Sequence, residues 1–258
     1  MAQTNDYFTK PSGKEEKVVS VDLWKTGMHG KKIGVNQQEI FMAKSNQFTR
    51  DMNLVGEIKE KDDKENGSIG VRDSIVEERL VLKAFSGSMT WLGTFEEATT
   101  LEIMNKLANK KSFPVFKVIL PRYDFIVELR KVMGGFLKTG KYSFFLNFDE
   151  EFNEFFTITE TRFSRGDDWL VKNFKKEVVA KIDGKMFDVG GQWDVKVYSP
   201  NLAKDKEFLT VLLLFAGFRK YEKDVTKRIG KIYNDYKKKK FKPDTDELSL
   251  YKNPRSKR

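Results

Sequence analysis

The C-terminal half of the chain alternates short apolar runs with glycine-containing connections. Such runs, rich in β-branched and aromatic residues, occupy 155–159, 169–171, 176–182, 186–189 and 193–198. In the last of them, Trp193, Val195 and Val197 alternate with polar residues, as in a strand with one buried face. Asp183-Gly184 and Gly190-Gly191 are typical of tight hairpin turns. We therefore expect an antiparallel meander that closes, fully or in part, into a barrel.

A second pattern follows at 204–221, where apolar residues surround a helix on nearly every side. Phe208, Leu212 and Phe215 lie in its middle, and a helix of this kind must be enclosed by protein or lipid. The apolar run is only about half of the roughly 20 residues that a membrane helix needs. We predict a core helix inside the barrel and no transmembrane span.

The N-terminal half has weaker patterns. Strands are expected at 18–24, 40–42, 75–83, 88–91, 115–120, 125–132 and 142–148, although 125–132 is also compatible with a helix. The polar stretch 57–67 is expected to be a loop.

An amphipathic helix is predicted at 94–110. Its apolar positions Ala98, Leu101, Met104 and Leu107 recur every three residues, with glutamates in the first turn and lysines in the last. The predicted fold class is thus α+β, mainly β: an antiparallel barrel wrapped around a hydrophobic C-terminal helix, with this additional helix.

The chain divides by composition into three parts. We expect an extended arm at 1–16, a single barrel-like domain at 17–222, and a basic helix and tail at 223–258. The tail helix is amphipathic. It is expected to dock on a membrane surface or an acidic partner, or to cover the open end of the barrel.

The order of these elements resembles the C-terminal part of the tubby-like superfamily, which includes phospholipid scramblases and plant LURP-one-related proteins. The matching features are 169–173 leading into the segment 178–185, then 193–197, and a hydrophobic helix directly afterwards. The resemblance implies a barrel of about twelve strands around a buried C-terminal helix. The chain shows no scramblase-type acidic calcium-binding segment and no cysteine cluster, which argues against calcium-activated lipid transport.

Composition excludes several kinds of chemistry. The chain contains no cysteine and one histidine, His29 in a Gly-rich turn, so thiolate zinc sites, multi-histidine metal sites and cysteine nucleophiles are excluded. There is no glycine-rich phosphate loop. The acidic runs at 149–151 and Asp167-Asp168 are typical of solvated turns. We expect no cofactor and no metal; an enzyme with an unfamiliar carboxylate site is the least favoured alternative.

Charge indicates the class of partner. The chain carries 48 Lys+Arg against 38 Asp+Glu, a formal charge of +10, so it should attract phosphate-bearing or acidic partners. Basic clusters occur at 237–240 and 255–258. The candidate anion-binding residues are Lys172, Lys175, Lys176, Lys181, Lys237, Lys238, Lys239 and Lys240. A solvated strand face and a solubilising tail are the plainer alternatives for them.

These features together favour a non-enzymatic adaptor or structural subunit of a larger assembly. We expect an intracellular protein, cytoplasmic or organellar, that contacts an anionic membrane surface and its lipid headgroups peripherally. The alternative is a protein associated with RNA or DNA, since aromatic and basic residues interleave along the chain. Because most phenylalanines fall at core-like positions, packing explains them more simply than base stacking does.

Overall fold

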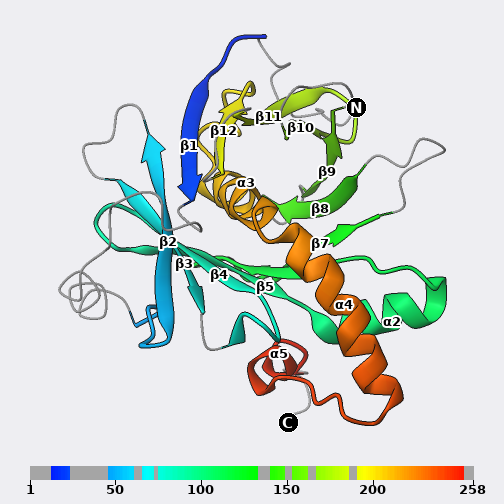
Figure 1. Cartoon of the computed structure of the whole chain (residues 1–258). Helices are drawn as coiled ribbons and strands as arrows, with labels where there is room; N and C mark the ends of the chain where they lie inside the picture. The colour runs from blue at the N-terminus through cyan, green and yellow to red at the C-terminus, as the bar shows by residue number, and fades with distance from the viewer. Residues whose placement is uncertain are drawn as a thin grey trace, which may run out of the picture.

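A closed antiparallel barrel is the centre of the fold in the part of the chain that the structure describes (Figure 1). The computed structural model describes residues 13–23, 46–60, 66–72, 75–132, 140–148, 153–161, 167–185 and 191–252. Its strands are β1 (Lys17–Leu23), β2 (Met52–Glu60), β3 (Gly67–Arg72), β4 (Val81–Phe85), β5 (Trp91–Glu97), β6 (Val115–Ile119), β7 (Val127–Lys131), β8 (Lys141–Asn147), β9 (Asn153–Glu160), β10 (Trp169–Lys172), β11 (Val178–Gly184) and β12 (Gln192–Val197). Each strand pairs with its neighbours in sequence, and β1 closes the ring by pairing with both β2 and β12.

Helix α3 (Lys206–Arg219) runs through the interior of this barrel (Figure 1). Every residue from Phe208 to Phe218 is buried, and Phe208, Leu212 and Phe215 are fully so. Burying a side chain of this size contributes about 1.5–3 kcal/mol, so α3 is the centre of the core. The predicted mainly β barrel around a hydrophobic C-terminal helix is confirmed.

The helix approaches the barrel wall closely at Gly93 on β5. A Cβ atom at this position would lie 2.8 Å from Cγ2 of Thr210 on α3. Aromatic rings fill the remaining space: Phe95 and Phe116 from the wall stack at 4.3 Å, and Phe218 of α3 lies 4.5 Å from Phe116. The N-terminal strands are thus part of the same core as the C-terminal meander.

Several expected boundaries in the N-terminal half are wrong. The stretch 57–67 is not simply a loop, because β2 continues to Glu60 and β3 begins at Gly67. Three of its polar residues, Glu57, Lys59 and Glu60, belong to β2, where Glu57 lies opposite both Asp22 and Ser68. The strands expected at 75–83 and 88–91 are instead β4 and β5, preceded by turns at 75–80 and 86–90. For 125–132 the strand is correct, as β7.

The helix predicted at 94–110 is shorter and turned differently from the prediction. Helix α2 (Thr99–Asn109) begins only after β5 has ended at Glu97. Met104 and Leu107, which belong to the predicted apolar face, are 61% and 50% exposed, whereas Glu102 is buried. The reason is that Glu102 accepts a hydrogen bond from the backbone of Val115 at 3.1 Å and turns a polar face inward.

The expected hairpin turn at Asp183-Gly184 is also wrong, because both residues belong to β11. Gly184 pairs with Trp193 and donates its N–H to Asp168 at 3.1 Å, so the strand extends beyond the sequence signal. The expected strands at 40–42 and 186–189 lie outside the described residues.

The two ends of the barrel differ in what they carry. The β6–β7, β8–β9 and β10–β11 connections lie at the end where α3 begins, which we call the hairpin end. Helices α2, α4 (Glu222–Lys237) and α5 (Thr245–Ser249) lie at the other end, the helical end, where α3 leaves the barrel (Figure 1). Among the described residues, no helix is both long and apolar enough to cross a membrane.

Candidate functional site

Three phenylalanine rings lie on the outer surface at the hairpin end. Phe145 on β8, Phe155 on β9 and Phe174 in the β10–β11 connection are 38%, 57% and 76% exposed. The rings of Phe145 and Phe155 are 5.7 Å apart, and the N–H of Phe174 donates to Glu154 at 2.9 Å, next to Phe155. We call these three residues the aromatic patch.

The aromatic patch follows from two Phe-Phe pairs in the sequence. Adjacent residues of a strand point to opposite faces, so Phe144 and Phe156 face the core while Phe145 and Phe155 face outward. The doubled phenylalanines are a sequence signal for exposed rings that composition alone does not reveal.

Lysines flank the aromatic patch. Lys175 and Lys176 are exposed beside Phe174, and Lys172 is partly buried at the end of β10. Within the described part of the chain these three predicted lysines form no ion pair. The turn that presents them is fixed, because the N–H of Lys176 donates to the carbonyl of Asn173 at 2.9 Å and Lys176 adopts φ 64°.

A neighbouring turn adds apolar surface at the same end. Phe125 and Ile126, between β6 and β7, are 50% and 39% exposed. Tyr123 ties this turn to the end of β8: its ring lies 5.9 Å from that of Phe125, and its hydroxyl accepts the N–H of Asn147. The hairpin end therefore presents five exposed apolar side chains together with the three lysines.

Lys181 is separated from the other predicted lysines by its own ion pairs. It lies 3.1 Å from Asp168 and 2.9 Å from Asp183. Burial opposes these pairs, but they prevail and raise the pKa of Lys181. Burial alone would raise the pKa of Asp183. The contacts of Asp183 with Lys181 and Lys196 outweigh burial and lower this pKa to about 2. Lys181 thus links Asp168 and Asp183 within the barrel wall and differs in this from the three lysines beside the aromatic patch.

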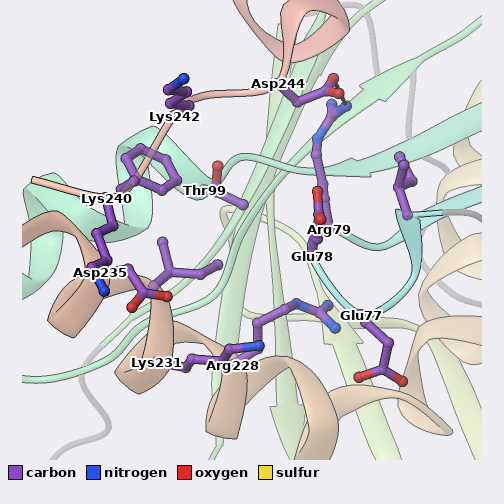
Figure 2. Close-up of a pocket in the computed structure, with 13 residues that line it drawn as sticks. Glu77, Glu78, Arg79, Thr99, Arg228, Lys231, Asp235, Lys240, Lys242 and Asp244 are labelled. Atoms are coloured by element: carbon purple, nitrogen blue, oxygen red, sulfur yellow. Dashed lines mark hydrogen bonds and ion pairs between the residues drawn. The ribbon is translucent and has the colours of Figure 1, made fainter.

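The remaining predicted lysines, 237–240, lie at the opposite, helical end. All four are exposed, and Lys237 lies 4.5 Å from the centre of the Tyr233 ring. Lys240 lines a hollow of about 330 Å³ between α4 and the segment that leads to α5 (Figure 2). The structure therefore places three candidate lysines at the hairpin end and four at the helical end, with Lys181 in the barrel wall apart from both groups.

The hollow does not form a strong anion site. Three of its lysines form no ion pair within the described chain: Lys231, Lys240 and Lys242. Its walls also carry the carboxylates of Glu77, Glu78 and Asp235. The two arginines beside it are engaged: Arg79 binds Asp244 (Figure 2) and Glu96, and Arg228 binds Glu97. The opposite charges nearly balance, so we assign no ligand to this hollow.

Behind the hollow lies a buried carboxyl pair. Glu97 binds Arg228 and also accepts the N–H of Leu80 at 2.7 Å. Burial, together with the negative charge of Glu97, raises the pKa of Glu102 well above its ordinary value. Among the described residues Glu102 Oε2 accepts no hydrogen bond, and a hydrogen bond to Glu97 also raises the pKa of Glu102. Its place in the core makes this pair structural.

The C-terminal helix completes the network through Glu247, which is fully buried. Its carboxylate accepts from the N–H of Thr100 at 2.8 Å and from the hydroxyls of Thr99 and Thr100. Helix α2 has no side-chain cap of its own, so Glu247 caps it from 147 positions away in sequence. No local signal in the sequence indicates this contact.

The acidic residues weighed as catalytic candidates have structural partners where they are described. Asp167 accepts from Arg219 at 2.9 Å and from the indole N–H of Trp169 at 2.8 Å, and Asp168 binds Lys181. In the described ranges no three His, Cys, Asp or Glu side chains are grouped to hold a metal ion. His29 and the acidic run 149–151 lie outside those ranges.

Comparison with known proteins gives no relative from which a role could be transferred. No family model matches the chain, and neither a curated protein nor a solved structure matches it.

Proposed function

We propose that this protein is a non-enzymatic adaptor that attaches peripherally to an anionic membrane surface through its hairpin end. The observation that carries the proposal is the aromatic patch, three exposed phenylalanines beside Lys172, Lys175 and Lys176. We retain the tubby-like resemblance as part of the proposal, since a barrel around a helix agrees with it.

The aromatic patch favours lipid for energetic reasons. Contiguous exposed apolar surface of this kind marks an interaction site, and full burial of a phenylalanine stabilises a complex by about 1.5–3 kcal/mol. Phe174 is the most exposed of the three rings and lies in a turn, where it can enter the headgroup region without disturbing a strand.

The flanking lysines supply the electrostatic part of the attraction. Each lysine close to an anionic leaflet contributes about 1 kcal/mol, and these three have no carboxylate partner within the described chain. Nucleic acid is less well suited to this end, because the rings of Phe145 and Phe155 already pack against each other, 5.7 Å apart at an interplanar angle of 37°. Base stacking needs free ring faces.

Vesicle flotation tests the proposal. The full-length protein should float with vesicles of phosphatidylserine and phosphatidylcholine and remain unbound with phosphatidylcholine alone. Phe155→Ser with Phe174→Ser should weaken binding roughly tenfold or more. The matched control is Met104→Ser with Leu107→Ser, which removes two similarly exposed apolar side chains from the helical end and should leave flotation unchanged.

Charge variants sharpen the test. Lys172→Gln, Lys175→Gln and Lys176→Gln together should abolish the preference for anionic vesicles. The β8–β9 connection carries Asp149, Glu150 and Glu151, so replacing these by amides should strengthen binding.

Equal flotation of the phenylalanine variant and the wild type would remove the membrane role. Selective loss of single-stranded RNA binding in that variant would favour the nucleic-acid alternative.

A further inference from the structure

A row of lysines lies along the outer face of α4. Lys223, Lys227 and Lys231 are exposed and follow one another at intervals of four residues, whereas Val225 and Ile229 on the same helix are buried. Residues four apart share a helix face, and four residues advance a helix by about 6 Å. We call Lys223, Lys227 and Lys231 the lysine ridge.

The charges of the lysine ridge are not neutralised within the described chain, where none of the three lysines forms an ion pair. Like charges four residues apart destabilise a helix, so folding alone does not account for the arrangement. The ridge continues into the basic segment 237–242. The whole segment 220–242 holds ten Lys+Arg against three Asp+Glu and so contributes seven of the chain's formal charge of +10.

The chemistry of this face narrows the class of partner. Tyr236, near its end, is the only large hydrophobic side chain of α4 that is exposed in the described structure. The face therefore lacks the apolar centre that a stable protein interface requires and the rings that a single-stranded nucleic acid requires for stacking. Evenly spaced ammonium groups instead suit a regular array of phosphates, which lysines bind as point charges.

We propose that the lysine ridge binds the phosphate backbone of a nucleic-acid duplex without reading its sequence. The choice of nucleic acid over lipid rests on the proposed function, in which the hairpin end faces the membrane. A strand of seven residues spans about 23 Å, well beyond the electrostatic screening length of about 8 Å at physiological salt. A membrane at the hairpin end is therefore too far from the ridge to bind it.

Two carboxylates border the ridge and limit its positive field. Glu77 and Asp224 line a second hollow, separate from the one in Figure 2, together with Lys227 and Lys231. Glu77 is exposed, so Glu77→Gln should tighten duplex binding modestly, in contrast to the lysine variants.

Fluorescence anisotropy with a short labelled DNA duplex, over about 50–200 mM salt, tests the proposal. Lys223→Gln, Lys227→Gln and Lys231→Gln together should raise Kd roughly tenfold or more at the lowest salt and reduce the salt slope by about three. The control variant with glutamine at Lys172, Lys175 and Lys176 should bind the duplex as the wild type does.

Each other outcome would overturn the duplex site. These outcomes are an unchanged Kd in the ridge variant, no duplex binding by the wild type at low salt, binding of polyglutamate as tight as that of the duplex, and loss of vesicle flotation in the ridge variant. The two proposals fail separately: duplex binding without flotation leaves the ridge standing, and flotation without duplex binding leaves the membrane role standing.

Discussion

The hairpin end and the helical end use charged side chains differently. At the helical end, the buried carboxylates of Glu97 and Glu247 lie against Arg228, Arg79 and threonine hydroxyls. At the hairpin end, Lys175 and Lys176 lie beside an exposed ring and have no carboxylate partner within the described chain. The first arrangement stabilises the fold, whereas the second leaves charge and apolar surface available to another molecule.

The helical end contains both a buried ion pair and exposed lysines, and helix α4 contributes to both. Arg228 faces inward from α4 toward Glu97, while Lys227, the preceding residue, faces solvent. Two neighbouring cations on one helix thus have different expected roles, the inner one in stability and the outer one in binding. Substitutions can separate these roles.

The largest effect is expected at the buried ion pair. Arg228→Met leaves the carboxylate of Glu97 buried without its cation, which should lower the free energy of unfolding by about 3–5 kcal/mol. Lys227→Met is the control and should change it by less than about 0.5 kcal/mol. Urea unfolding followed by tryptophan fluorescence measures both; equal effects would mean that the buried network does not stabilise the helical end.

A smaller effect is expected where α5 caps α2. Glu247→Gln weakens the hydrogen bonds to Thr99 and Thr100 and should destabilise the protein by about 1–3 kcal/mol. Hydrogen exchange should accelerate at the Thr100 amide. Asp246→Asn, at an exposed residue that binds Arg72, is the control. Unaltered exchange in the Glu247 variant would show that the cap is dispensable.

A third effect depends on pH. Burial and the charge of Glu97 hold the pKa of Glu102 well above its ordinary value, so the folded protein keeps a proton that the unfolded chain releases near pH 4.3. The stabilising contribution of this proton is complete below that pH. It is lost as pH rises toward the folded-state pKa, by at most about 1.4 kcal/mol per pH unit.

Glu102→Gln should remove this dependence, because glutamine keeps a hydrogen-bond donor and cannot ionise. The variant should therefore gain stability over the wild type increasingly as pH rises from about 4.3 toward neutral. Glu78→Gln, at an exposed residue, serves as the control. Parallel pH profiles for Glu102→Gln and the wild type would contradict a protonated Glu102. Thermal unfolding across this pH range gives the comparison.

The barrel and its central helix were predictable because their signals are local. An all-round apolar helix such as α3 needs a container, and closely spaced hairpins supply one. The limits of α2 were not predictable, since its three-residue apolar repeat includes Met104 and Leu107, which the structure leaves exposed. Long-range contacts decided that orientation.

The candidate sites were predictable only in part. Lys175 and Lys176 could be named from composition, but the engagement of Lys181 depends on Asp168, which comes from another strand connection. The outward rings of Phe145 and Phe155 could have been inferred from their Phe-Phe pairs and were not. The cap by Glu247 had no sequence signal, because its partners lie far away along the chain.

The most direct test of the account measures both ligands with the same two variants, the Phe155→Ser, Phe174→Ser pair and the Lys223→Gln, Lys227→Gln, Lys231→Gln triple. The account predicts that the phenylalanine variant loses flotation with anionic vesicles and keeps duplex binding, and that the lysine variant does the reverse. If either variant lost both activities, or if neither lost any, the two ends of the barrel would not be separate binding surfaces and the account would be contradicted.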